Sequence, residues 1–241
     1  MKRTRHLIEC EKFYEHAKRR KPFITIEYCF SYSEDKDLVD KLLEDAKKLH
    51  DNVCPKAAND SVHDRNTNVI MANCIAGVFS EYCWALLLNT KGKYVETTDF
   101  SSAATQIDLR VIRNNRRIEV RSSFPRNGVV FSVCHPQFEF DILGPYANEY
   151  KPGEISKDYY VRALFPAQYP TDIISKVKSE SFSVFLAGGA TSAMMNDPKI
   201  AITKSLVPED AFYQEIKTEY KVVPYHNALD CKEMYYAITE D

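Results

Sequence analysis

Glycine and proline are scarce in this sequence, with 7 and 11 respectively in 241 residues. That scarcity excludes collagen-like and low-complexity chains, and a hydrophobic content of 44% predicts a globular protein with a substantial core. Long apolar runs are also lacking, so we expect no membrane span. After the basic start, Glu9, Glu11 and Lys12 interrupt any apolar core of a signal peptide, and we therefore expect a cytoplasmic location.

The sequence also lacks paired metal-binding or redox motifs. Its 7 cysteines are odd in number, scattered and include no CxxC pair, so we expect neither a zinc site nor a disulfide framework. Most of them are expected to be core residues in a reducing compartment. No P-loop, GxGxxG, GxSxG or HExxH motif supports a small-molecule enzyme. The segment 188–192 is either an anion-binding turn before a helix or a plain strand-to-helix connection.

Helical and strand patterns alternate along the chain, which predicts an α/β or α+β protein with a mixed central sheet flanked by helices. Residues 1–66 form an N-terminal elaboration, with a helix at 6–19, a strand at 22–30 and a helix from Ser33. The core spans 67–241 and includes a C-terminal extension. Its expected helices lie at 68–89, 171–178, 190–196 and from Pro208, and its expected strands at 94–98, 105–112, 117–124, 129–134, 138–143, 158–165, 182–187 and 218–225.

Positive charge is concentrated in one segment, although the net charge of the chain is only −2. Six arginines and a single acid, Glu119, lie between Arg110 and Arg126. Such a density of guanidinium groups suits a polyanionic substrate. A solvated hairpin face would explain the same pattern equally well.

Two acids lie on adjacent strands of this segment. Alternation places Asp108 and Arg110 on one face of the first strand, and Glu119 and Arg121 on the same face of the second. A tight turn at 114–115 would set Asp108 opposite Arg121 and Arg110 opposite Glu119, with the acids as diagonal neighbours. The acids could then share a metal ion. Two cross-strand ion pairs, of roughly 0.2–1 kcal/mol each, would account for the same four residues.

Glu81 supplies a third carboxylate, on the helix at 68–89. Its face of the helix is mostly apolar and includes Trp84, and a carboxylate there is costly unless it finds a partner. Gly77, one turn earlier, would leave room for the close approach of a strand. In the alternative interpretation, Asn73, Gly77, Ser80 and Glu81 form a narrow polar stripe that faces water.

Together these residues resemble the restriction-endonuclease-like superfamily, the PD-(D/E)xK nucleases, whose core is a helix, three strands, a helix and a strand. The helical glutamate of the family is similar to Glu81, its strand aspartate to Asp108, and its acid-x-lysine triplet to Glu119-Val120-Arg121. The resemblance covers residues 68–190 and rests on three short motifs. It departs from the family pattern at two points, because Arg121 replaces the lysine and no proline precedes Asp108.

The resemblance implies a site in which Glu81, Asp108 and Glu119 bind Mg²⁺, or Mn²⁺. The activity implied is that of an endonuclease that hydrolyses DNA phosphodiester bonds, of a restriction or mobile-element type. Arg121 would stabilise negative charge on the phosphate, but a guanidinium group does not readily lose a proton. Lys157 or Lys151 is therefore a candidate for the place of the missing lysine.

The arginines of the hairpin are expected to hold the DNA backbone, which fixes position rather than base sequence. They are Arg110, Arg113, Arg116 and Arg117. A double-strand cutter of this type would act as a homodimer, since one site severs one strand. The alternative function is a catalytically inactive nucleic-acid-binding or assembly protein on the same fold.

Overall fold

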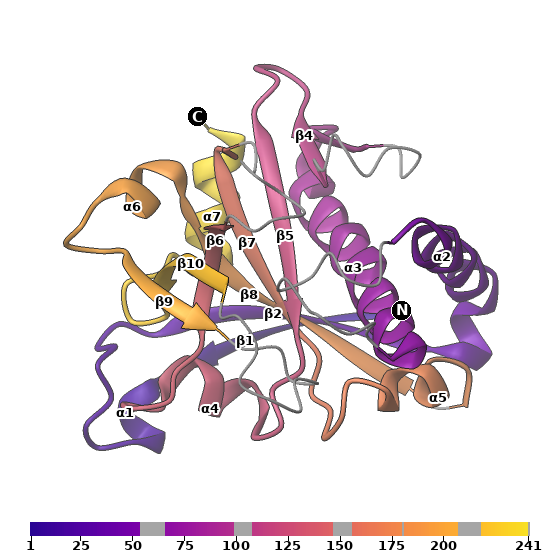
Figure 1. The fold of residues 1–241 in the computed structure, drawn as a ribbon, viewed down its shortest axis with the longest axis horizontal. Helices are drawn as coiled ribbons and strands as arrows, with labels where there is room; N and C mark the ends of the chain where they lie inside the picture. The colour runs from indigo at the N-terminus through magenta and orange to yellow at the C-terminus, as the bar shows by residue number, and fades with distance from the viewer. Residues whose placement is uncertain (54–65, 99–107, 147–155, 180, 207–217, 241) are drawn as a thin grey trace.

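Two sheets and their covering helices form the fold of this computed structural model, which describes residues 1–53, 66–98, 108–146, 156–179, 181–206 and 218–240 (Figure 1). The strands are β1 (Lys2–Ile8), β2 (Phe23–Ser31), β3 (Val95–Thr97), β4 (Leu109–Val111), β5 (Arg117–Ser123), β6 (Asp141–Tyr146), β7 (Tyr159–Leu164), β8 (Ser181–Thr191), β9 (Ile202–Leu206) and β10 (Thr218–Pro224). The larger sheet has the order β1-β2-β8-β7-β5-β4-β3, and the smaller has the order β6-β10-β9.

The helices divide between the two faces of the large sheet. They are α1 (Cys10–Phe13), α2 (Tyr32–Asn52), α3 (Thr67–Leu88), the 3-10 turn η1 (Asn89–Lys91), α4 (Gly128–Cys134), α5 (Asp172–Ser179), α6 (Ser192–Asn196) and α7 (Cys231–Thr239). On one face, α2, α3, α5 and α7 enclose an apolar cluster. On the other, α1, α4, α6 and the small sheet enclose a second cluster. The expected fold class, a mixed central sheet flanked by helices, is confirmed.

Pairing within the large sheet is antiparallel except at one junction, where β5 runs parallel to β7. A parallel pair requires a crossover connection, and here the crossover contains α4 and β6. β1 and β2 extend the same sheet at its far edge, so the N-terminal part of the chain adds strands to the core sheet.

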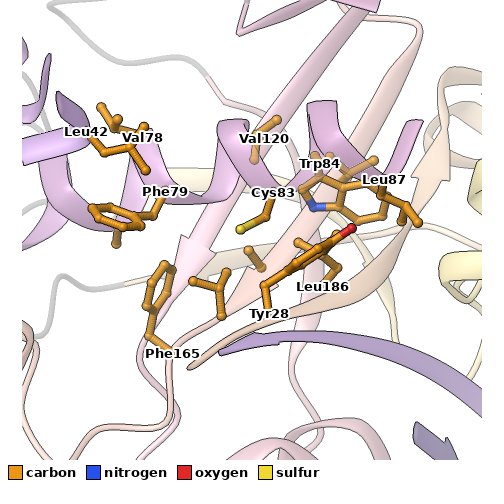
Figure 2. Packing of buried hydrophobic residues seen from close by; sticks show 14 of the residues in the cluster. Tyr28, Leu42, Val78, Phe79, Cys83, Trp84, Leu87, Val120, Phe165 and Leu186 are labelled. Carbon is orange, nitrogen blue, oxygen red and sulfur yellow. The ribbon is translucent and has the colours of Figure 1, made fainter. Parts of the chain in front are cut away.

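The helix α3 organises the first apolar cluster. It is apolar nearly all round, as expected of a helix that is buried on several sides. Figure 2 shows Phe79, Cys83 and Trp84 of α3 directed toward side chains of the sheet, among them Tyr28 and Leu186. By length and composition alone, the segment Thr67–Lys91 would pass for a membrane span, but 61% of its most apolar window is buried in this fold. Such burial is that of a core helix.

Two expected elements are wrong. Residues 6–19 are not one helix, because β1 pairs with β2 along its whole length and only Cys10–Phe13 is helical. The strand expected at 129–134 is the helix α4, in which Val129 and Val133, one turn apart, are buried in the second cluster. In both cases tertiary packing overrides local propensity. Segment 188–192 is the connection from β8 to α6, and the helix expected from Pro208 lies outside the described residues.

A disulfide joins Cys10 in α1 to Cys134 at the end of α4. The sequence predicted no disulfide framework and mostly reduced core cysteines, and this pair departs from that expectation. The residues are 124 positions apart, and the sequence carries no local sign that the fold brings them together. Within the described residues, Cys29, Cys74, Cys83 and Cys231 form no disulfide.

The disulfide closes a long loop, so its removal should lower stability through the entropy of the unfolded chain. We expect the double variant Cys10→Ser/Cys134→Ser to lose about 2–5 kcal/mol of unfolding free energy in urea titrations. The single variant Cys29→Ser, at a half-buried free thiol, serves as the control. Equal midpoints for the double variant and the wild type would contradict the assigned bond.

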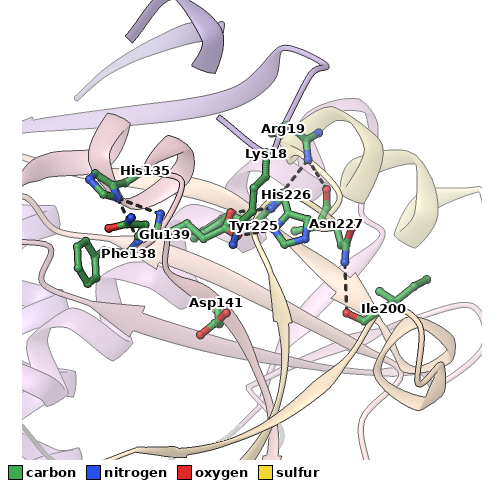
Figure 3. A network of polar contacts seen from close by, with 12 residues as sticks. Lys18, Arg19, His135, Phe138, Glu139, Asp141, Ile200, Tyr225, His226 and Asn227 are labelled. Carbon is green, nitrogen blue, oxygen red and sulfur yellow. Dashed lines mark hydrogen bonds and ion pairs between the residues drawn. The ribbon is translucent and has the colours of Figure 1, made fainter. Parts of the chain in front are cut away.

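A polar network ties the segment before β2 to the turn after β10 (Figure 3). The buried Arg19 guanidinium donates to the carbonyl oxygens of Tyr225 at 3.1 Å and Ala228 at 2.8 Å. His226 pairs with the carboxylate of Glu139, which also accepts from the His226 backbone N–H at 3.0 Å. The Glu139 carboxylate thus has hydrogen-bond partners, and the network joins chain segments that are distant in sequence.

Phe79 occupies the centre of the aromatic packing beneath α3. Its ring is fully buried and lies 5.2 Å from Phe30 and 5.1 Å from Phe182, between ring centroids. Because truncation leaves a cavity that close packing cannot refill, we expect Phe79→Ala to cost about 3–5 kcal/mol of unfolding free energy. Phe13→Ala, at a ring that is 57% exposed, should cost about 0.5 kcal/mol or less in the same urea titration. Similar losses for the two variants would contradict this account of the core.

Candidate active site

The three predicted carboxylates come from α3, from the residue before β4, and from β5. Glu81 is 8% exposed and Glu119 6% exposed. The Asp108 residue keeps some accessible surface, but its carboxylate is turned inward against the β5 backbone. The alternative in which Glu81 faces water is therefore wrong.

Gly77 does not bring a strand close to α3. A methyl group added there would meet no atom of the described residues within 4 Å, so no strand in that part of the chain makes the expected close approach. Of the other members of the expected polar stripe, Asn73 is exposed, whereas Ser80 is buried and its hydroxyl donates to the Ala76 carbonyl oxygen at 2.6 Å. Glu81 is thus a carboxylate set in a packed face of α3.

The register of the β4–β5 hairpin differs from the expected one by two residues. Leu109 pairs with Ile118 and Arg110 with Arg117, because the connection is longer than a two-residue turn and Asn115 takes up the left-handed conformation at φ 59°. A shift of two leaves every side chain on its expected face. It removes both expected cross-strand ion pairs, however, and it sets two arginines opposite each other.

The ladder between β4 and β5 ends at Leu109, and Asp108 takes the next place. Its Oδ2 accepts a hydrogen bond from the Val120 backbone N–H at 2.6 Å. A side-chain carboxylate thus replaces the backbone carbonyl that a longer strand would offer. This bond holds Asp108 beside the residue that follows Glu119.

The Glu119 carboxylate forms ion pairs with two cations. Arg121 Nη2 lies 2.8 Å from Glu119 Oε1, and Lys157 Nζ lies 2.9 Å from Oε2. The Lys157 side chain is only 1% exposed, and its backbone N–H donates to the Tyr160 hydroxyl at 3.1 Å. Of the two lysines considered for the place of the missing family lysine, Lys157 lies at the acidic cluster. Lys151 lies outside the described residues.

Three carboxylates in this cluster face two cations, and the imbalance raises the proton affinity of Glu81 and Asp108. Burial, together with the charges of Asp108 and Glu119, raises the pKa of Glu81 well above its usual value. Burial and the neighbouring Glu119 raise the pKa of Asp108 to about 8, against the opposing influence of the Val120 N–H, Arg121 and Lys157. The cluster therefore favours an added positive charge, whether a proton or a cation.

A divalent ion at this cluster would need oxygen ligands that converge on one point. Across the described ranges, no group of three or more His, Cys, Asp or Glu side chains is arranged to hold a metal. Magnesium needs fewer protein ligands, because it keeps several waters and binds through one or two carboxylates plus substrate phosphates. Glu119 Oε2 is buried and lies 2.9 Å from the Lys157 ammonium, and among the described residues no donor bonds to it with ordinary hydrogen-bond geometry, so this oxygen is the candidate ligand atom.

The four hairpin arginines are spread along β4, the turn and β5. Arg113 is exposed at the turn, whereas Arg110 and Arg117 are half-buried and directly opposed. Arg116 Nη1 donates to the Tyr159 hydroxyl at 2.8 Å. Like charges directly opposite on neighbouring strands are unfavourable, but on its other side Arg110 pairs in register with Glu96 of β3.

Sequence reasoning missed a buried arginine on β7. Arg162 pairs in register with Arg121, is 4% exposed and donates to the Ser123 hydroxyl at 2.6 Å. Burial lowers its pKa, and the Arg121 charge acts in the same direction. An arginine inside an otherwise apolar central strand was the sequence feature that could have identified it, since such a charge is rarely buried without a role.

The fold and site define an α+β protein with a buried cluster of acidic and basic side chains beside the β4–β5 hairpin. No protein-family model and no solved structure matches the chain. A stretch of 151 residues is 26% identical to an uncharacterized protein of Methanocaldococcus jannaschii, and the match covers 56% of this chain and 53% of the relative. The chain thus spans about half the length of the curated relative it matches. This likeness assigns neither a family nor an activity.

The raised pKa of Asp108 makes a prediction about pH. Between about pH 4 and the folded pKa of about 8, the folded protein holds a proton that the unfolded chain releases, so stability falls as pH rises through this window. Asp108→Asn keeps an acceptor for the Val120 N–H and carries no charge. We expect it to raise the unfolding free energy by on the order of 1 kcal/mol at pH 8 and by much less at pH 4.

Urea unfolding at the two pH values measures this difference. Asp37→Asn, at an exposed position on α2, is the matched control and should leave the pH dependence unchanged. A stabilisation of Asp108→Asn that is the same at both pH values would contradict the buried, proton-binding carboxylate.

Proposed function

We propose that this protein is a divalent-metal-dependent endonuclease of the PD-(D/E)xK type that hydrolyses DNA phosphodiester bonds. The observation that carries the proposal is the meeting of Lys157 with Glu119, at 2.9 Å, next to Asp108 and Glu81. Acids on a helix and two adjacent strand segments, with one lysine among them, make up the side-chain set that the resemblance calls for. Here the lysine comes from the start of β7, and Arg121 holds the place it has in the family triplet.

The order of elements supports the same proposal. The chain runs through α3, β3, β4, β5 and α4 before β7, with β6 inserted, and β5 lies parallel to β7. This is the helix, three strands, helix and strand expected from the resemblance. The elements that match this order are the ones that carry or adjoin Glu81, Asp108 and Glu119.

Asp108 and Glu119 would hold Mg²⁺, or Mn²⁺, with Glu81 as a third ligand, directly or through water. When bound, the ion would polarise a phosphoryl oxygen and lower the pKa of water, chemistry that suits hard oxygen ligands. The excess of buried carboxylates over cations supports this assignment, because an added cation would relieve it.

The cations of the cluster have separate tasks in this scheme. Arg121 presents a planar guanidinium that can hold phosphate oxygens, although it cannot readily exchange a proton. Lys157 carries a single ammonium on a buried side chain and can both stabilise charge that builds up on the phosphate and take part in proton transfer. Arg162, adjacent in register to Arg121, adds to the positive potential on this side of the sheet.

DNA is the proposed partner, held along its backbone by Arg110, Arg113, Arg116 and Arg117. A homodimer is proposed for the cleavage of both strands. We propose a cytoplasmic location, where DNA is available. Inside cells, a structural disulfide such as Cys10–Cys134 persists mainly in proteins of hyperthermophiles. The proposed cytoplasmic location therefore requires an organism of that kind.

Digestion of a supercoiled plasmid with Mg²⁺ or Mn²⁺ tests the proposal. We expect nicking or linearisation by the wild type and a loss of at least about 100-fold in rate for Asp108→Asn, Glu119→Gln and Lys157→Ala, because each removes a charge that acts on the reacting phosphate. Glu219→Gln, an exposed acid on β10, is the control and should cut at the wild-type rate. Circular dichroism confirms that each variant is folded. Cleavage by Asp108→Asn at the wild-type rate would contradict the proposed mechanism.

The second candidate function is a nucleic-acid-binding or assembly protein that performs no chemistry. It is favoured by the two cations that already neutralise Glu119 and by the absence, in the described part of the chain, of a three-ligand metal group. In the same experiment it predicts salt-sensitive DNA binding with no cleavage in either metal. Calorimetric titration with Mg²⁺ or Mn²⁺ in the absence of DNA would then show no binding.

A further inference from the structure

We propose that a cavity at the β1 edge of the molecule is a binding site for a nucleoside phosphate. The cavity has a volume of about 350 Å³ and lies between β1, β2, the C-terminal end of α3 with η1, and α7. That volume is within the range of small-ligand sites, which are mostly apolar with a few polar groups that fix orientation.

Four cations surround the cavity: Arg3, Arg5, Lys91 and Lys232. Arg3 and Arg5 are two residues apart on β1 and so project from the same face of the strand. Arg3 Nη1 donates to the Thr90 hydroxyl at 3.4 Å, which links β1 to the end of α3.

No acid balances these cations at the cavity. None of its lining residues is an acid, and in the described ranges no ion pair joins any of the four to a carboxylate. Three acids are adjacent in sequence to lining residues: Asp230 and Glu233 form the capping box of α7, and Glu27 bonds to His6 and Ser183. Glu233 also faces Arg19 at 3.8 Å. Four unbalanced positive charges around one cavity favour an anion, and arginine is suited to phosphate.

The rest of the lining is apolar and aromatic. Ile24 and Ile26 of β2, Leu87 of α3 and the buried Cys231 of α7 form it with two tyrosines. Tyr235 and Tyr236 follow Cys231 by four and five residues, so one side of α7 faces the cavity. Lys91 Nζ lies 5.8 Å from the Tyr235 ring centroid, and Lys232 Nζ lies 5.9 Å from that of Tyr236, which holds each ammonium group beside an aromatic face.

Charge and apolar surface together select the ligand class. An inorganic anion would leave the aliphatic and aromatic lining unused, and a fatty acid carries one charge for four cations. A nucleoside phosphate matches both the charged and the apolar part of the cavity, because its phosphate can bind the cations and its base can stack on a tyrosine. Two ligands carry a nucleoside phosphate: a free nucleotide and the terminal nucleotide of a nucleic-acid strand.

The site is separate from the acidic cluster and does not rest on the proposed endonuclease activity. Its strands β1 and β2 are separated from β5 by β8 and β7 in the sheet order. At the usual strand spacing, β2 and β5 are about 14 Å apart. Binding at the cavity can therefore be measured with the acidic cluster inactivated.

Isothermal titration of the full chain, with a chelator present to remove divalent ions, tests the proposal. AMP and UMP should bind with one site per chain, and adenosine or inorganic phosphate alone should bind at least about tenfold more weakly. The variant Arg5→Glu/Lys91→Glu should weaken AMP binding by about tenfold or more, while Lys41→Glu, an exposed charge on α2, should not change it. Asp108→Asn should bind AMP as the wild type does.

The aromatic contribution has its own pair of variants. Tyr235→Ala should weaken AMP about tenfold and leave the weak binding of phosphate unchanged, whereas Tyr235→Phe should restore the affinity for AMP. A 5′-phosphorylated single-stranded oligonucleotide that binds where AMP does not would assign the site to strand ends. Binding of neither, equal affinity for AMP and phosphate, or an unchanged affinity in Arg5→Glu/Lys91→Glu would each overturn the proposal. Unfolding midpoints verify that the variants are folded.

Discussion

The parallel pairing of β5 with β7 is the constraint on which the acidic site depends. Its register places Glu119 beside Tyr160. Because Lys157 precedes Tyr160 by only three residues, the lysine ammonium lies within ion-pair distance of the Glu119 carboxylate. A slip of one residue would turn Glu119 to the opposite face of the sheet, into the apolar cluster under α3. Because the two strands are joined by a crossover and not by a turn, this register is held by packing on both faces of the sheet.

Charge balance inside the protein explains the character of the cluster. Taking charges out of water costs several kcal/mol per ion, and only close partners repay it. Glu119 has two such partners, whereas Asp108 has a backbone N–H and Glu81 is surrounded by apolar residues of α3. Well-packed apolar side chains would serve stability at least as well at these positions. The three acids therefore contribute little to the stability of the fold.

The helix α3 connects the features of the molecule that concern function. Glu81 lies near its middle, and one turn on the Trp84 indole donates to the Arg162 carbonyl oxygen at 3.2 Å, which ties the helix to the centre of the sheet. Its C-terminal end reaches the cationic cavity through Leu87 and Lys91. A single apolar helix that is buried on several sides thus fixes the distance between an acidic cluster and a basic one.

Local patterns were sufficient for the elements with strong periodicity. The apolar content of α3, the alternation around Glu119 in β5 and the candidate acids themselves follow from the printed residues, because helix and strand periods decide which side chains share a face. Where periodicity was weak the prediction failed. The valines of α4 have strand propensity, yet burial of Val129 and Val133 on one side makes a helix.

Contacts between distant segments were decided only by the tertiary structure. The choice of Lys157, the burial of Arg162 and the Cys10–Cys134 bond all join parts of the chain whose separation carries no local pattern. The two-residue shift of the β4–β5 hairpin belongs with them, since the loop conformation at Asn115 and the place of Asp108 against Val120 set that register. The sequence by itself determined which acids share a face of the β4–β5 hairpin. The folded chain decided which cations meet them, because only the pairing of strands distant in sequence brings those charges within reach.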